Sequence, residues 1–110
     1  MTRRIVLLTK DNNFKSFVNI SALTLTKLNY QVDISESIRQ DADLIIIDFD
    51  NSENTEILKS IRKDPEFKNK KIFGVISDFK HKSDEIFKAG CDSLMSKKEF
   101  ERAGNNVLMY

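Results

Sequence analysis

A continuous apolar run, Leu44–Ile47, lies near the middle of the chain and is followed directly by Asp48. Three of its four residues are isoleucines, which are β-branched. A short run that is apolar at every position is typical of a strand covered on both faces, as in a parallel sheet. Ligands of open α/β sheets bind at the carboxyl ends of the strands, so Asp48 is the first candidate for chemistry. The alternative is that Asp48 only caps the next helix or begins a turn.

This run and its flanking carboxylates define one strand, and four further segments have the apolar content and the length of strands. The five predicted strands are Arg4–Thr9, Tyr30–Ile34, Asp43–Asp48, Lys71–Ser77 and Ser93–Ser96. Apolar residues between these segments recur at spacings of three and four, which predicts amphipathic helices. The helical patterns run from Phe14 to Leu28, around Ile57, Leu58 and Ile61 before Pro65, from Ser83 to Ala89 with Ile86, Phe87 and Ala89 inward, and from Phe100 to Leu108.

Strand and helix patterns thus alternate five times along the chain. This alternation predicts βαβ units with right-handed crossovers, and therefore an α/β doubly wound parallel sheet with helices on both faces. One connection is unusual, because Ser35–Ala42 is shorter than the dozen or so residues that a parallel crossover normally needs. We expect a single turn or an irregular loop there, so that the second helix is shortened. Apolar surface beside Ile34 and Ile38 would then be left for a partner or a second copy of the chain.

Composition and charge narrow the class of protein. The chain has 110 residues, which we expect to form one domain over residues 1–110. The formal net charge of +1 gives no general attraction to nucleic acid or to anionic membranes, so we expect neither as a partner. The single cysteine, Cys91, excludes an internal disulfide, and we expect it to be a small buried thiol. Only four apolar residues follow Met1–Arg4, which is too few for a signal peptide or a membrane span, so we expect a cytoplasmic location.

Several segments together resemble the receiver domain of bacterial two-component response regulators (CheY-like). The matching segments are Asp43–Asp48, Ile61–Phe67, Ser77 and Lys88–Lys97. The resemblance covers nearly the whole chain and implies a flavodoxin-like, five-stranded parallel sheet in the order 2-1-3-4-5. It also implies that Asp48 is the phosphoacceptor and that Ser77 and Lys97 contact the phosphoryl group.

The chain departs from this family at the acid pair that holds Mg²⁺. Thr9 and Lys10 stand where the family has two acidic residues at the end of the first strand. The carboxylates left as metal ligands are Asp48, Asp11 and Asp50, so we expect Mg²⁺ binding to be weak or absent. If Lys10 points inward, it repels a metal and pairs with Asp48, and if it points outward, the site only lacks ligands.

The resemblance implies a function in phosphorelay signal transduction rather than an enzyme. We expect phosphorylation of Asp48 to be impaired and the output to be a protein–protein interaction, with a histidine kinase or a downstream signalling protein as partner. A homodimer is left open. One alternative is a pseudo-receiver scaffold that never accepts phosphate. Another is a small flavodoxin-like protein that binds a nucleotide or a flavin, although the chain has only three glycines and no glycine-rich phosphate loop.

Overall fold

Five parallel strands form one sheet at the centre of the computed structural model, which describes residues 2–24, 29–34, 43–78 and 83–108. The strands are β1 (Thr2–Leu8), β2 (Asn29–Ile34), β3 (Leu44–Asp48), β4 (Ile72–Ile76) and β5 (Ser93–Ser96). Their order in the sheet is β2-β1-β3-β4-β5. The predicted α/β fold class and strand order are confirmed. The order changes direction between β1 and β3, and in open α/β sheets ligands bind at the carboxyl ends of such a pair.

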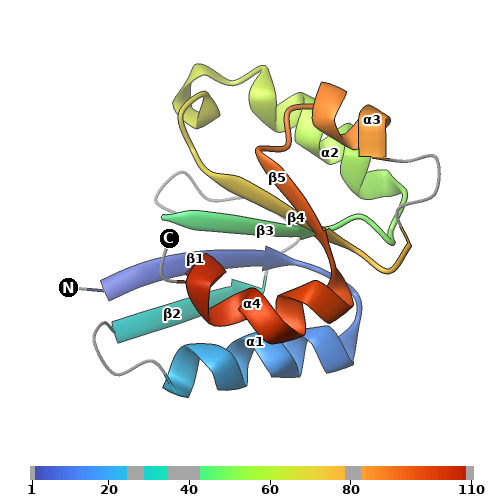
Figure 1. The fold of residues 1–110 in the computed structure, drawn as a ribbon. Coiled ribbons are helices and arrows are strands. Elements are labelled where there is room, and N and C mark those ends of the chain that lie inside the picture. The colour runs from blue at the N-terminus through green and yellow to red at the C-terminus, as the bar shows by residue number, and fades with distance from the viewer. Residues whose placement is uncertain (1, 25–28, 35–42, 79–82, 109–110) are drawn as a thin grey trace.

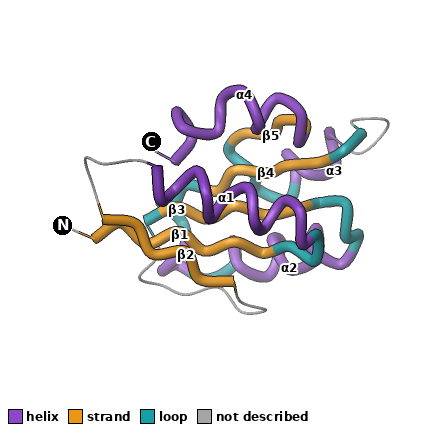
Figure 2. Tube along the Cα trace, turned by 90° about the horizontal axis from the view of Figure 1, so that it is seen from below, coloured by secondary structure: helices purple, strands orange, loops and turns teal. Residues whose placement is uncertain are grey.

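The helices cover both faces of this sheet. They are α1 (Asn12–Thr24), α2 (Glu53–Arg62), α3 (Ser83–Lys88) and α4 (Lys97–Leu108), with a short 3-10 helix at Pro65–Phe67. Helices α2 and α3 lie on one side of the sheet, and α1 and α4 lie on the other (Figure 1). The view from below in Figure 2 has α1 in front of the strands and α2 behind them. Within the described residues, no helix is long and apolar enough to cross a membrane.

The prediction of a shortened second helix concerns residues 35–42, which lie outside the described part of the chain. The expected apolar surface beside Ile34 and Ile38 also depends on side chains outside it. Both stay predictions.

The central strand β3 divides its side chains between the two faces. Leu44 and Ile46 pack with the side chains beneath α1 and α4, while Ile45 and Ile47 pack with those beneath α2 and α3. All four side chains are 0% exposed, as the uninterrupted apolar pattern predicts. Burial of these four side chains therefore fixes the position of Asp48, the polar residue at the carboxyl end of the strand.

Aromatic packing fixes α4 against α1. The ring of Phe100 meets the ring of Phe14 edge-on, with a distance of 5.2 Å between centroids, and the ring of Phe17 at 6.2 Å. Phe100 is 0% exposed. Since α4 begins at Lys97, one turn before Phe100, this packing also positions the first residue of the helix.

Phe49, the residue after Asp48, fills the space above a glycine of β4. A side-chain carbon placed on Gly74 would lie 2.6 Å from the Phe49 ring and 2.9 Å from Leu94, which is closer than atoms can approach. Phe49 is 1% exposed. The glycine therefore leaves room for the large ring of the residue that follows the candidate carboxylate.

One prediction for α3 is wrong. Phe87 was expected to face inward with Ile86 and Ala89, but it is 47% exposed, whereas Ile86 and Ala89 are 1% and 5% exposed. Successive helical residues lie about 100° apart around the axis, so a helix that faces Ile86 to the sheet turns Phe87 away from it. Ala89 returns toward the sheet at the end of the helix, where Gly90 takes the positive φ of 114° that favours glycine.

Arg62, at the end of α2, connects the α2–β4 and α3–β5 segments at the edge of the sheet opposite Asp48. Its Nε donates to the carbonyl of Gly90 (2.8 Å), one Nη donates to the carbonyl of Phe67 (2.7 Å), and the other donates to Asp92 (2.9 Å). Asp92 in turn accepts a hydrogen bond from the backbone N–H of Ile72 (2.8 Å). The planar guanidinium can hold several acceptors in one fixed geometry, which a lysine cannot do.

We expect Arg62→Lys to lower the free energy of unfolding by about 2 kcal/mol, because several hydrogen bonds to a charged donor are lost together. The measurement is urea unfolding followed by circular dichroism. Arg102→Lys, at an exposed position of α4, is the matched control and should change the value by less than about 0.5 kcal/mol. Equal effects of the two substitutions would show that the Arg62 contacts do not stabilise the fold.

Candidate functional site

Polar side chains from three strand ends meet at the carboxyl edge of the sheet. Asp11 follows β1, Asp48 ends β3, and Lys97 follows β5 at the start of α4. They line an open hollow of about 420 Å³ together with Lys10, Asp50 and Asn51. The hollow is thus built from the switch point of the sheet, as the strand order leads one to expect.

The ammonium group of Lys97 lies at the centre of this cluster. Its Nζ is 2.9 Å from Asp48, 3.0 Å from Asp11 and 2.7 Å from Asp50. The Lys97 side chain is only 16% exposed, and its Nζ also lies 5.6 Å from the centroid of the Phe14 ring. An ammonium has three N–H donors, so three carboxylates use all of them.

The charges of the cluster reinforce one another. Burial opposes the charged form of Lys97, but its hydrogen bonds to Asp50, Asp48 and Asp11 raise its pKa above the ordinary value of 10.5. Burial likewise opposes ionisation of Asp50, but hydrogen bonds from Lys97 and Ser77 lower its pKa below 3.8. The hydrogen bond from Lys97 lowers the pKa of Asp11 as well. Lys97, Asp50 and Asp11 are therefore ionised at neutral pH.

Asp48 is held by neighbours on every side. One carboxylate oxygen accepts a hydrogen bond from the backbone N–H of Asp50 (2.9 Å), and the other accepts one from the hydroxyl of Thr9 (2.6 Å) and faces Lys97. Its backbone carbonyl accepts a hydrogen bond from the side-chain amide of Asn54 (2.6 Å). Asp48 is 3% exposed, so its orientation is fixed before any ligand arrives.

Of the two orientations considered for Lys10, the structure has the one that points away from Asp48. Its side chain is 76% exposed, and its Nζ lies 4.0 Å from Glu53. Thr9, in contrast, faces Asp48 directly. The two residues that replace the acidic pair of the resembled family therefore have different surroundings, and only Thr9 contacts the candidate carboxylate.

Ser77 joins the cluster through Asp50. Its hydroxyl donates to one oxygen of Asp50 (2.6 Å) and its backbone N–H donates to the other (2.9 Å). Asp50 then contacts Lys97, so Asp48, Ser77 and Lys97 lie in one connected network, as predicted from the sequence. The hydroxyl of Ser77 is hydrogen-bonded to Asp50 and not to Asp48, which the sequence did not indicate.

Sequence reasoning missed the contacts of Thr9 and Asn54. Thr9 directly follows β1 at the edge of the sheet where Asp48 lies, so its place in the chain was a usable signal. Asn54 lies in the first turn of α2 and could only be recognised as a helix-capping type of residue.

A divalent cation does not fit this arrangement unless Lys97 moves. Asp11, Asp48 and Asp50 are the oxygen ligands that Mg²⁺ prefers, but the ammonium already lies within 3.0 Å of each. At about 4 Å and an effective dielectric near 20, a divalent ion and an ammonium repel by roughly 8 kcal/mol. Within the described ranges, no group of three or more His, Cys, Asp or Glu residues is arranged to hold a metal ion.

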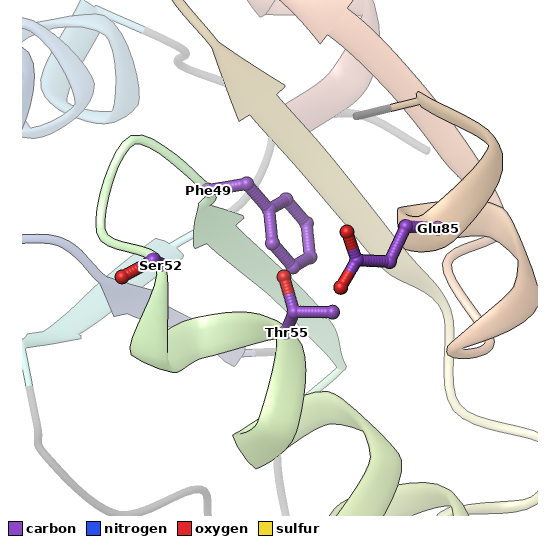
Figure 3. A pocket seen from close by; sticks show the side chains of 4 residues that line it. All are labelled: Phe49, Ser52, Thr55 and Glu85. Atoms are coloured by element: carbon purple, nitrogen blue, oxygen red, sulfur yellow. The ribbon is translucent and has the colours of Figure 1, made fainter. Parts of the chain in front are cut away.

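A second, smaller hollow is bordered by the ring of Phe49. It has a volume of about 60 Å³ and is lined by Phe49, Ser52, Thr55 and Glu85. In Figure 3 the ring of Phe49, the hydroxyl of Thr55 and the carboxylate of Glu85 lie close together, and Ser52 lies farther away. A water molecule takes about 30 Å³ in the liquid, so this space suits one or two waters and is too small for a cofactor.

Cys91 is the buried thiol that the sequence predicts. It is 6% exposed, and its Sγ donates to the carbonyl of Ser93 (3.0 Å). Burial raises the pKa of the thiol to about 11, so the nucleophilic thiolate is scarce at neutral pH. The cysteine belongs to the core and not to the site.

Comparison with known proteins places the fold. No family model and no curated protein matches the sequence. The phosphorylated cyanobacterial phytochrome response regulator RcpA matches the structure with a TM-score of 0.78 at 11% identity, over 97% of this chain and 91% of that one. The Mn²⁺-bound response regulator Rcp1 matches with a TM-score of 0.78 at 13% identity, over 98% and 93%.

A further match is the signal receiver domain of a two-component histidine kinase from Clostridium thermocellum, with a TM-score of 0.73 at 17% identity over 98% of both chains. The resemblance to receiver domains is thus confirmed for the fold. At these identities the likeness concerns the fold alone.

Removing the ammonium should create a cation site. We expect Lys97→Met to bind Mg²⁺ or Mn²⁺ more than about tenfold more tightly than the parent, since a tenfold change requires only about 1.4 kcal/mol and the lost repulsion is larger. The measurement is isothermal titration calorimetry. Lys98→Met, at the exposed neighbouring position, is the control and should behave as the parent. Tight Mg²⁺ binding by the parent would contradict this account.

The same cluster predicts the pH dependence of stability. The lowered pKa values of Asp11 and Asp50 give stability that is fully present above pH 3.8 and is lost as pH falls through the folded-state values. The raised pKa of Lys97 gives stability that is present below pH 10.5 and is lost only as pH rises through its folded-state value. We expect the free energy of unfolding of the parent, measured with urea, to fall between about pH 6 and about pH 3. The same measurement on Lys97→Met should show a smaller fall.

Proposed function

We propose that residues 1–110 form one receiver-like signalling domain that accepts a phosphoryl group at Asp48 and acts through protein partners. The observation that carries this proposal is the position of Asp48. It is a buried carboxylate at the end of the central strand, it borders an open hollow, and an ammonium lies 2.9 Å from it. Such a carboxylate is a suitable nucleophile for a phosphodonor, because charge neutralisation and positioning are the main requirements of phosphoryl transfer.

In the proposed step, an oxygen of Asp48 attacks the phosphorus of a phosphodonor. The new bond joins this oxygen to phosphorus, while the bond from phosphorus to the leaving group breaks and the leaving group takes the electron pair. Lys97 would neutralise one phosphoryl oxygen, and the hydroxyl and backbone N–H of Ser77 would donate to the others. Thr9 would lose its present contact or donate to the ester oxygen.

The charges of the site support slow phosphorylation. One ammonium lies among three carboxylates, so an excess of two negative charges already surrounds the position of an incoming phosphoryl group. A site that binds its metal poorly cannot offset this charge by a bound cation. We therefore propose that Asp48 accepts a phosphoryl group more slowly than the aspartate of a site that has the acid pair for Mg²⁺.

Two of the matched structures support the class of chemistry. RcpA is described as phosphorylated and Rcp1 as Mn²⁺-bound, so proteins with this fold take part in both kinds of event. For this chain, a histidine kinase or a downstream signalling protein is the proposed partner. A cytoplasmic location remains part of the same proposal.

The second candidate function is a pseudo-receiver scaffold that never accepts phosphate. The observation that favours it is the complete pairing of Lys97, whose three N–H donors face three carboxylates. A stable site of this kind could present a fixed surface to a partner without any modification.

Phosphotransfer from a small donor separates the two functions. We expect incubation with acetyl phosphate and Mg²⁺ to add one phosphoryl group, measured by intact-protein mass spectrometry, and Asp48→Asn to abolish the adduct. Asp84→Asn, at an exposed position of α3, is the matched control and should leave the adduct unchanged. An unmodified parent protein would overturn the phosphoacceptor proposal and favour the scaffold.

A further inference from the structure

The carboxylate of Asp50 accepts hydrogen bonds from Ser77 and pairs with Lys97 in the candidate site. We infer that Asp50 is a built-in anion, which occupies the hydrogen-bond donors that a phosphoryl group on Asp48 would require and so inhibits the site from within. The inference rests on the proposed function, because it assumes that a phosphoryl group is added to Asp48. The occupied donors themselves are features of the structure.

Three donors converge on this one side chain. The hydroxyl of Ser77 lies 2.6 Å from one oxygen of Asp50, the backbone N–H of Ser77 lies 2.9 Å from the other, and Nζ of Lys97 lies 2.7 Å from the first. These lengths are those of charge-assisted hydrogen bonds. Asp50 therefore binds the end of β4 and the start of α4 as a small oxyanion would.

The loop after β3 places Asp50 in this position. The backbone N–H of Asp50 donates to the carboxylate of Asp48 (2.9 Å) and closes a turn. In this turn the side chain of Asp50 is directed toward Ser77. The Asp50 side chain is 34% exposed and borders the hollow, whereas that of Asp48 is 4% exposed. Asp50 is thus more exposed to an anion from the solvent than Asp48, and Ser77, whose donors it occupies, is exposed as well.

A phosphoryl group on Asp48 could use Ser77 and Lys97 only after Asp50 had released them. It would also have to lie beside a carboxylate of the same sign. The built-in anion therefore slows anion entry in two ways, by occupying donors and by repulsion. It also keeps Ser77 engaged, as an anion on Asp48 would, when no phosphoryl group is present.

The first test measures anion binding without any covalent step. Inorganic phosphate is titrated into ¹⁵N-labelled protein, and its affinity is read from the amide signal of Ser77. We expect Asp50→Ala to bind phosphate at least about tenfold more tightly than the parent, because three donors become free. Asp50→Asn keeps the shape and loses the charge, so it should give a gain in the same direction.

The control is Glu56→Ala, which removes an exposed carboxylate of α2 whose partner, Lys59, does not line the hollow. It should leave the phosphate affinity within about twofold of the parent. An unchanged affinity in both Asp50 variants would overturn the inference. An equal gain in Glu56→Ala would overturn it as well, because general charge would then explain the result.

The second test separates this inference from the proposed function. The rate of phosphoryl addition from acetyl phosphate is compared between the parent and Asp50→Ala by mass spectrometry, and we expect at least about a tenfold increase. If Asp50→Ala binds inorganic phosphate but neither protein is modified at Asp48, the built-in anion stands and the phosphoacceptor proposal fails. If both proteins are modified at equal rates and bind phosphate equally, the phosphoacceptor proposal stands and the built-in anion fails.

Discussion

The compensation of buried charge by Lys97 is the interaction on which the arrangement of the site depends. Burying a carboxylate that is 4% exposed, as Asp48 is, costs free energy unless the group is paired and hydrogen-bonded. The pairing ammonium comes from the first residue of α4, and the packing of Phe100 against Phe14 fixes that helix on α1. The apolar core on this face of the sheet therefore sets the geometry of the charged cluster.

Asp11 connects the cluster to the beginning of α1. One of its oxygens accepts hydrogen bonds from the backbone N–H groups of Asn13 (3.0 Å) and Phe14 (3.2 Å), as a capping residue does, and its other oxygen faces Lys97 (3.0 Å). The start of α1 and the start of α4 thus share one side chain. A displacement of Lys97 would remove a contact from both helices, so the site and the packing of this face are coupled.

The parts of the molecule that could be predicted are those fixed by hydrophobic periodicity. The run Leu44–Ile47 indicated a fully covered strand, and each of its side chains is 0% exposed. The prediction for Phe87 was wrong because the periodic signal is too short there. Helix α3 has only six residues, and so few apolar positions do not define which side of the helix faces the sheet. The parallel sheet, with Asp48 at the end of a strand, followed from the alternation of strands and helices along the whole chain, and the strand order followed from the resemblance to receiver domains.

Polar contacts in the site could be placed only in part. The sequence put Asp48, Ser77 and Lys97 at one edge, but it could not show that Asp50 takes the hydroxyl of Ser77, because side-chain direction in a loop follows no period. The contacts of Arg62 could not be predicted from the sequence either. A basic residue in the last turn of a helix usually favours the helix dipole, and its partners here are carbonyls that are remote in the sequence.

The charge balance of the site, more than its shape, decides what it can hold. The hollow is large enough for a phosphoryl group, but its three carboxylates outnumber Lys97. Lys10 lines the same hollow and is turned toward Glu53 across 4.0 Å, an exposed pair of the kind worth at most about 1 kcal/mol. Its outward orientation is therefore held weakly, while the inward carboxylates are held strongly. An added anion is retained only if a positive charge moves in or a negative one moves out, so phosphorylation, cation binding and the release of Asp50 must be energetically linked.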